Sequence, residues 1–403
     1  MNPTTERVGF VLHLGRALHA YGTPAHRLEE TLARVAERLG VPGQFFATPT
    51  SLIAAFGPIE EQRTHLLRLD PGETDLERMA VIDRIGGEVL AGRLSPEQGS
   101  ARIEAAQAAP GRYPVALEVL AFGLSSAAAA RFLGGGGAEV AVAGVIGLVT
   151  GTLQASVARV PGIKRVFAPL AAAIAAAIAT AASRPLGGLA ISTAMLGGIL
   201  VLVPGLTLTV AMAELSARHL VAGTARLAGA LGTFLGIAFG VAIGARVAAA
   251  AFGAPLAHDP IALPPWTELL ALAVAPLTFT VLLRAHPRAI PNILVVGALA
   301  FFAGRTGARL LGPELGIFTA ALVAAGASNL IARRINRPAS ITLVPALLLI
   351  VPGSVGFRSL ASLLDRATVD GVETAFRMTL MLAALVTGLF AAQILAPARR
   401  WSE

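Results

Sequence analysis

The sequence contains no cysteine. Disulfide bonds, thiolate metal sites and a cysteine nucleophile are therefore excluded. Charged residues are also scarce, at 14% of the 403 residues, whereas a soluble domain carries about a quarter. The shortage is uneven, because fourteen of the 24 acidic residues precede Arg112. The chain thus divides into a polar segment and a longer segment that is poor in charge.

A nucleic-acid partner is not expected, although the formal net charge is +8. Residues 1–112 hold twelve arginines against fourteen acidic residues and are not basic. The excess positive charge lies in short loops of the later segment, where a membrane protein carries it on the cytoplasmic side. Basic residues are not interleaved with aromatic ones either, as binding of single-stranded nucleic acid would require.

Residues 1–112 predict a small soluble α+β domain. Apolar residues recur at helical spacing over Phe10–Tyr21 and again over Leu28–Leu39. Between these two helices, Thr23 suits an N-cap and Pro24 suits the first helical position.

A β-hairpin and two more helices are predicted next. The short apolar runs Phe45–Phe56 and His65–Leu69 are bounded by turn residues, which is typical of paired strands. Asp75–Leu90 has a helical pattern, and Ser95–Gln98 is a capping box that starts the last helix. The predicted order is α-α-β-β-α-α. The domain has no phosphate loop, metal-ligand spacing or nucleophile–base pair, so we expect no enzyme, no cofactor and no metal.

From Val115 onward, apolar runs of about 20 residues alternate with short loops, which is the pattern of transmembrane helices. We predict an all-α polytopic membrane protein with about ten spans in the lipid bilayer. The expected spans are 114–133, 140–158, 166–182, 186–210, 224–252, 266–283, 289–304, 315–331, 340–351 with its continuation, and 373–395.

The charges of the loops predict the orientation. Positive residues gather around Lys164, Arg226, Arg288 and Arg334, whereas Gly253–Pro265 has neither lysine nor arginine. Loops rich in positive charge stay in the cytoplasm. The first residues are polar and unlike a signal peptide. We therefore expect a multi-pass protein of the inner (cytoplasmic) membrane whose N-terminal domain is cytoplasmic.

The membrane part contains two similar halves, residues 113–253 and 254–403. In the first half Arg184-Pro185 precedes Val203-Pro204-Gly205, and in the second Arg337-Pro338 precedes Val351-Pro352-Gly353. Five spans per half is an odd number, so the second half would be inserted upside down. Inverted repeats with interrupted spans in matching positions are typical of transporters.

The Pro-Gly pairs predict the substrate site. Proline removes a backbone hydrogen bond, and glycine leaves helical angles at little cost, so each pair should break its helix. The half-helix after a break presents free N–H groups and a positive dipole end, to which a carboxylate would bind. A structural kink without a ligand is the alternative. The candidate substrate-binding residues are Pro204, Gly205, Thr207, Thr209, Pro352, Gly353, Ser354 and Arg358.

Two acidic residues are candidates for proton or ion coupling. Glu118 lies about one turn into the first predicted span, and Glu214 lies within about three turns of the first break. A charge inside the membrane predicts a function. Both residues, like Arg358, could instead lie at the membrane surface.

The order of these motifs over nearly the whole chain resembles the threonine/serine exporter family. Where family members carry aspartate after the glycine run, this chain has Glu139. The motifs are Gly22-Thr23-Pro24, Arg27-Leu28-Glu29, Phe46–Thr50, Leu94–Glu97, Phe132–Gly136 with Glu139, Val203–Leu206, and Pro352–Ser354 with Arg358-Ser359.

The resemblance implies ion-driven export of small hydroxy amino acids such as threonine and serine. The chain is also similar to two-subunit carriers associated with succinate export, so a dicarboxylate is the alternative substrate. A channel and a membrane-anchored signalling or hydrolytic protein are rival classes. The sequence does not fix the oligomeric state, and a homo-oligomer stays open.

Overall fold

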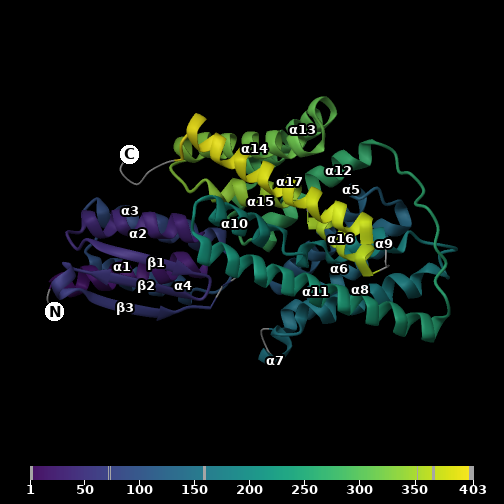
Figure 1. The fold of residues 1–403 in the computed structure, drawn as a ribbon, viewed down its shortest axis with the longest axis horizontal. Helices are drawn as coiled ribbons and strands as arrows, with labels where there is room; N and C mark the ends of the chain where they lie inside the picture. Colours follow the sequence, from purple (N-terminus) through teal and green to yellow (C-terminus); the bar gives the residue numbers. More distant parts are fainter. Residues whose placement is uncertain are drawn as a thin grey trace.

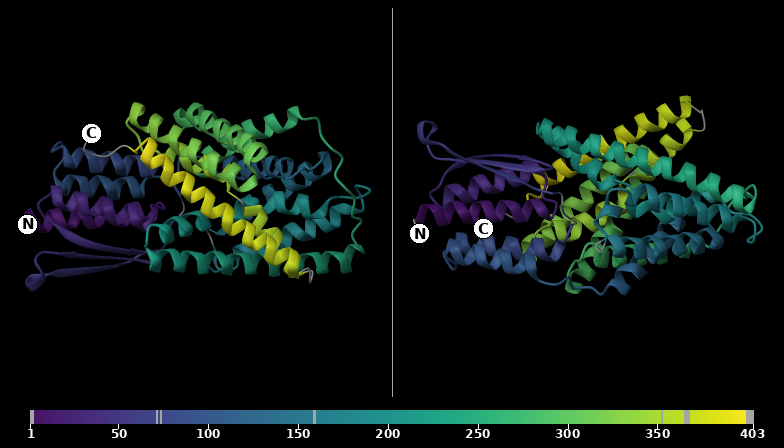
Figure 2. Two further views of the ribbon diagram at one scale, coloured as in Figure 1. Left: turned by 45° about the horizontal axis from the view of Figure 1, so that its top comes forward. Right: turned by 90° about the horizontal axis from the view of Figure 1, so that it is seen from below.

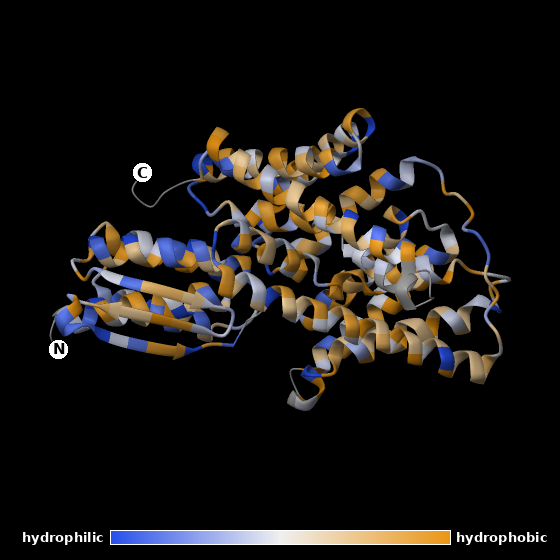
Figure 3. Cartoon of the chain, in the orientation of Figure 1, coloured by the Kyte–Doolittle hydropathy of each residue, from blue (hydrophilic) through white to orange (hydrophobic). Residues whose placement is uncertain are grey.

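The protein is described by a computed structural model over residues 3–70, 72, 74–157, 160–351, 353–364 and 368–398. An N-terminal α+β unit lies at one end of an elongated bundle of helices (Figure 1). Polar residues are concentrated in this N-terminal unit, and the bundle is mainly apolar (Figure 3). The described end of the chain returns to the side of the N-terminal unit in every view (Figure 2).

The N-terminal unit packs helices on one face of an antiparallel sheet. Its sheet has the order β1-β2-β3. Alternate residues of the middle strand, Leu52, Ala54 and Phe56, are buried against the helices, as the two-residue period of a strand requires. The elements are α1 (Pro3–Ala20), α2 (Ala25–Arg38), β1 (Gly43–Thr48), β2 (Ser51–Phe56), η1 (Ile59–Glu61), β3 (Arg63–Arg68), α3 (Leu76–Leu90) and α4 (Pro96–Ala108).

Two details of the predicted domain are wrong. The run Phe45–Phe56 is not one strand, because the chain turns at Pro49 and Thr50 and pairs Thr48 with Ser51. The N-cap of α2 is Pro24 rather than Thr23. The predicted capping box is confirmed, since Ser95 and Gln98 bond reciprocally at the start of α4.

The described part of the bundle has seven helices long and apolar enough to cross a membrane, or eight if a bent pair is counted as one span. Two further apolar helices, α8 and α12, have only 17 residues each. The helices are α5 (Val115–Phe132), α6 (Gly137–Val157), α7 (Pro161–Lys164), α8 (Phe167–Ser183), α9 (Ile191–Ile199), η2 (Leu200–Leu202), α10 (Gly205–Ser216), α11 (Leu220–Phe252), α12 (Trp266–Leu282), η3 (Pro287–Ala289), α13 (Ile290–Leu311), α14 (Pro313–Ile335), α15 (Ser340–Ile350), α16 (Gly353–Leu364) and α17 (Thr368–Leu395). The chain is therefore a polytopic helical membrane protein.

Helices α5 and α12 run antiparallel to each other. At one end Glu118 of α5 pairs with Arg284, which follows α12, at 3.2 Å. At the other end Arg131 of α5 donates a hydrogen bond to Thr267 of α12 at 2.7 Å. The first helix of each predicted half thus meets the other in opposite directions.

The N-terminal unit contacts loops that the charge pattern places on one side of the membrane. The backbone N–H of Leu76 bonds to the carbonyl of Leu283, and the Tyr113 hydroxyl bonds to the carbonyl of Ala285. Helix α11 has 33 residues and is about 50 Å long, which exceeds the thickness of the hydrocarbon core, and its Ala222 belongs to the core of the N-terminal unit.

The arginine-free connection between the halves lies at the opposite end of the bundle. It packs on the loop before α9, where Leu189 and Ala257 form a parallel bridge. Arg184 donates a hydrogen bond to the carbonyl of Ala254 at 2.9 Å. This connection therefore covers the end of the first half that is remote from the N-terminal unit (Figure 1).

Candidate functional site

The two Val-Pro-Gly segments interrupt their helices, and the valine of each segment has nearly the same backbone angles. Val203 has φ −67° and ψ 126°, and Val351 has φ −66° and ψ 130°. The N–H of Gly205 bonds back to the carbonyl of Val203 at 2.7 Å, and the N–H of Gly353 bonds back to Val351 at 2.9 Å. At the first break this bond across one residue is that of a γ-turn, so α10 begins within a single tight turn after η2. The first break bends α9–η2 against α10 by 56°.

The two breaks touch each other in the centre of the bundle. A side-chain Cβ placed on Gly205 would lie 2.4 Å from Cγ1 of Val351 and 3.6 Å from the Cα of Gly353. A Cβ on Gly353 would lie 3.0 Å from Cγ1 of Val203. Gly205 is therefore needed for the close approach of the two segments, whereas a side chain at Gly353 would require Val203 to shift by a few tenths of an ångström. We call this contact the crossing: Val203 and Gly205 meet Val351 and Gly353, which lie 148 residues later in the sequence.

A cavity of about 650 Å³ runs from the N-terminal unit toward this crossing. It is lined by α1, α2 and α3 on one side and by α10, α14, α15 and α17 on the other. Its membrane-side lining includes Leu206, Thr209 and Leu347, which lie within a turn or two of the breaks. A cavity of this size accommodates a small organic solute.

The predicted substrate residues are distributed unevenly around the cavity. Thr209 lines it, is 2% exposed and donates a hydrogen bond to the carbonyl of Gly205 at 3.1 Å. Thr207 is exposed and Ser354 is partly buried, and neither lines the cavity. Pro352 lies outside the described residues. Arg358 belongs to α16, and its side chain also lies outside the described part.

The two coupling candidates are both in ion pairs. Glu118 and Arg284 are each between a quarter and a third exposed, at the edge of the bundle nearest the N-terminal unit. Glu214 is fully buried near the end of α10, and both of its carboxylate oxygens lie within hydrogen-bond distance of Nε of Arg226, at 2.9 and 3.0 Å. The same carboxylate accepts the N–H of Ala25 at 2.8 Å.

The contact between Glu214 and Ala25 explains how α2 begins. Proline at the N-cap has no side chain that can accept a hydrogen bond, so the first N–H of α2 lacks a local partner. Glu214, which lies 189 residues later, accepts it instead. The N-terminal unit is therefore fixed to the half-helix that begins at the first break.

A second buried carboxylate, Glu139, joins two loops at the far end of the first half. It is 4% exposed and accepts the N–H of Gly136 at 2.8 Å and the N–H of Ala190, the N-cap of α9, at 2.9 Å. Its position in the first turn of α6 places a negative charge where the helix dipole favours one. The glycines beside it, Gly134–Gly136, form the loop between α5 and α6.

Sequence reasoning missed Arg27 as a member of the site. Arg27 lies on α2, lines the cavity and is partly buried. Burial lowers the pKa of its guanidinium, whereas the nearby Glu30 favours the charged form. The only sequence signal was its place in the Gly22–Glu29 motif.

His26 also borders the cavity. Its Nδ1 is buried and has no hydrogen-bond partner among the described residues. Burial, assisted by the neighbouring Arg27 and by His219, lowers the pKa of His26 to about 4. The side chain is therefore neutral at pH 7.

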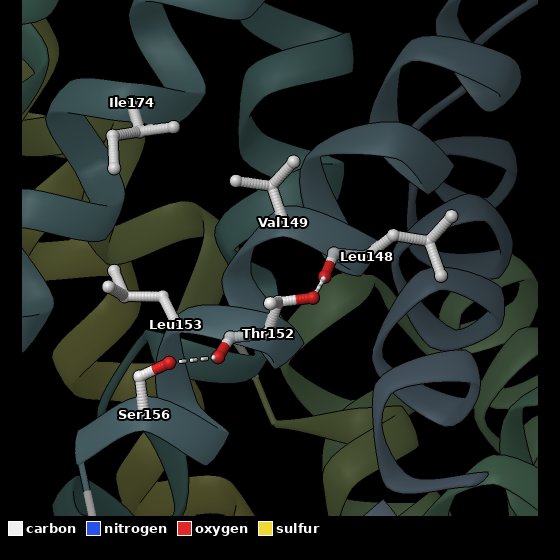
Figure 4. Close-up of a pocket in the computed structure, with 6 residues that line it drawn as sticks. All are labelled: Leu148, Val149, Thr152, Leu153, Ser156 and Ile174. Carbon is white, nitrogen blue, oxygen red and sulfur yellow. Dashed lines mark hydrogen bonds between the residues drawn. The ribbon is translucent and has the colours of Figure 1, made fainter. Parts of the chain in front are cut away.

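A smaller depression between α6 and α8 is not a comparable site. It has a volume of about 380 Å³ and is mainly apolar (Figure 4). Its two hydroxyl groups are already used within α6, because Thr152 donates to Leu148 and Ser156 donates to Thr152 (Figure 4). Among the described residues, no group of three or more histidine, aspartate or glutamate side chains is placed to hold a metal.

Comparisons with known proteins agree with this architecture. Residues 9–248 match a family model of threonine/serine exporters (ThrE), and residues 268–395 match a second model, described as threonine/serine exporter, ThrE. No solved structure matches the chain.

Curated relatives come from yeasts. Pheromone-regulated membrane protein 10 of Candida albicans is 26% identical over 391 residues, which cover 93% of this chain and 34% of that protein. The protein of the same name from Saccharomyces cerevisiae is 26% identical over 87% of this chain and 46% of its own length. The chain thus spans less than half the length of these relatives. The two family models together cover most of the chain, which belongs to the threonine/serine exporter family of membrane transporters.

Proposed function

We propose that the protein is a secondary transporter that exports a small carboxylate-bearing solute, threonine or serine in the first instance, from the cytoplasm. The observation that carries this proposal is the contact between two matching helix breaks beside a cavity of about 650 Å³. Irregular backbone inside a membrane protein is stable only where protein or a wet cavity satisfies its polar groups. Membership of an exporter family supports the direction.

The breaks would bind the carboxylate through backbone groups. Because α10 begins at Gly205, the N–H groups of its first turn have no partner within the helix, and they carry the positive end of its dipole. The matching start of α16 at Gly353 would supply the same groups from the second half. We propose ten spans in two inverted halves, which the antiparallel α5 and α12 and the equal angles at Val203 and Val351 support.

The transport cycle would move one half against the other about this crossing. Inverted halves exchange their conformations, so a site between them opens first to one side and then to the other. The cavity extends toward the N-terminal unit. We place this unit on the cytoplasmic side of the inner membrane. The energy would come from an ion or proton gradient, with Glu118 and Glu214 as the candidate coupling groups.

A dicarboxylate such as succinate is the second candidate. The cavity is lined by four arginines, Arg27, Arg34, Arg38 and Arg337, against the three acidic residues Glu30, Glu37 and Asp83. An excess of positive charge favours a substrate with more than one carboxylate. Neutral zwitterions would gain less from it.

Counterflow in proteoliposomes tests the proposal. Vesicles are loaded with unlabelled threonine, serine or succinate, and uptake of the labelled counterpart is followed. Accumulation that depends on the internal solute identifies a carrier and its substrate class. Flux without counterflow, at rates that no carrier reaches, would favour a channel.

A double substitution tests the site. Replacing Pro204 and Gly205 by alanine should restore the missing helical hydrogen bonds, straighten α9–α10 and abolish counterflow. Gly229→Ala is the matched control, because a Cβ there would meet nothing within 4 Å. Wild-type flux in a folded double variant would refute the role of the break.

A further inference from the structure

The N-terminal unit contributes Arg27 to the lining of the cavity, and this arginine is not paired with a carboxylate of the described chain. Arg27 forms no ion pair and no hydrogen bond with another residue in the part of the chain that the structure describes. Glu30, the acid that influences it, lies one turn further along α2 and pairs with Arg34 at 3.6 Å. A positive charge that is partly buried and unpaired destabilises a protein unless a ligand compensates it.

The position of Arg27 is fixed by the broken helix. Ala25, two residues earlier, donates its N–H to Glu214 of α10. Glu214 follows Gly205 by nine residues of helix, or about 14 Å. Arg27 is therefore held at the outer part of the cavity, while the first break lies at its inner part.

We propose that Arg27 binds the carboxylate of the transported solute as it enters the cavity, so that the N-terminal unit forms part of the substrate site. This inference rests on the proposed function and adds a binding group to it. The guanidinium group of arginine binds a carboxylate through two parallel hydrogen bonds, and arginine is the residue best suited to this recognition. The solute would then pass from Arg27 to the N–H groups in the first turn of α10 that follow Gly205.

The proposal predicts opposite effects on binding and on stability. Arg27→Gln should raise the KM for counterflow by about tenfold to a hundredfold, because a charge-assisted hydrogen bond is lost. The same variant should unfold at a temperature no lower than the wild type, because it removes an uncompensated charge. Arg27→Lys should recover part of the affinity, since it keeps the charge and loses the two-pronged geometry.

The experiment uses the full chain in proteoliposomes and in detergent. Counterflow is measured for threonine and succinate, and equilibrium binding of the same labelled solutes is measured in detergent. Arg16→Gln is the matched control, because Arg16 is exposed on α1 and does not line the cavity.

The outcomes separate this inference from the proposed function. Binding that is lost in Arg27→Gln and retained in Arg16→Gln supports the site, even if the wild type shows no counterflow and the transporter proposal fails. Wild-type counterflow with an unchanged KM in Arg27→Gln overturns the role of Arg27 and leaves the transporter proposal intact. A loss of thermal stability together with a loss of binding in Arg27→Gln also overturns it, because the arginine is then structural.

Discussion

Substituting Glu214 should loosen the contact between the start of α2 and the membrane helix α10. Glu214→Gln removes the negative charge that pairs with Arg226 at 2.9 Å and weakens the acceptor for the N–H of Ala25. Glu214 is fully buried, and the side chain of Arg226 is only 17% exposed, so the variant leaves a largely buried charge without its partner. Breaking such a pair costs about 3–5 kcal/mol.

Hydrogen exchange at the start of α2 measures this cost. A loss of 3–5 kcal/mol should speed exchange of the Ala25 amide at least a hundredfold, because each 1.4 kcal/mol is about a factor of ten. Glu30→Gln is the control, because the Glu30–Arg34 pair is exposed and contributes about 1 kcal/mol or less. The double variant Glu214→Gln/Arg226→Met should recover much of the protection, since no charge is then left unpaired.

The same variant distinguishes docking from ion coupling. If the carboxylate only fixes α2, Glu214→Gln should expose α2 and lower counterflow and gradient-driven flux together. If it carries the coupling proton, counterflow should persist while the effect of a pH gradient disappears. Unchanged exchange at Ala25 in Glu214→Gln would refute the docking argument.

Three further predictions concern the crossing, the histidine and the far loops. Gly205→Ala should impair transport, because its Cβ would lie 2.4 Å from Cγ1 of Val351. Adding Val351→Ala should restore part of the flux. If the double variant does not recover, the defect lies elsewhere. His26 has a folded-state pKa of about 4 against 6.5 for the free side chain, so the unfolded chain binds more protons between these values. Stability should therefore fall, by at most about 3 kcal/mol, as the pH drops from 6.5 to 4, and thermal unfolding of His26→Asn should show a flatter pH dependence. Glu139→Ala would leave the buried N–H of Gly136 and the partly buried N–H of Ala190 without an acceptor. It should lower stability by about 1–3 kcal/mol or more, whereas Glu139→Asp should retain part of the stability. An unchanged melting temperature in Glu139→Ala would contradict this.

Local patterns in the sequence determined the class of the protein. Hydropathy identified a polytopic helical membrane protein, because a span must be apolar along its own length whatever it packs against. The helix breaks at Pro204 and Val351 were predictable for the same reason, since proline removes a hydrogen bond within its own helix. The capping box at Ser95 also depends on residues three apart.

Predictions from short-range sequence patterns were wrong at two places, the turn at Pro49 and the start of α2. The turn at Pro49 was hidden inside an apolar run, so one strand was predicted where the chain forms two. The start of α2 was placed at Thr23 because the sequence around it suits a local cap. The actual partner of this helix end is Glu214, and no local pattern could indicate it.

Only the tertiary structure decided how the site is assembled. The contact of Gly205 with Val351 depends on the packing of two halves, and the free charge of Arg27 depends on which helices enclose it. Contacts between residues far apart in the chain follow from the balance of all packing interactions, which no window of sequence contains. The sequence therefore determined which residues can break a helix or carry a charge, and the fold decided which of them meet around the cavity.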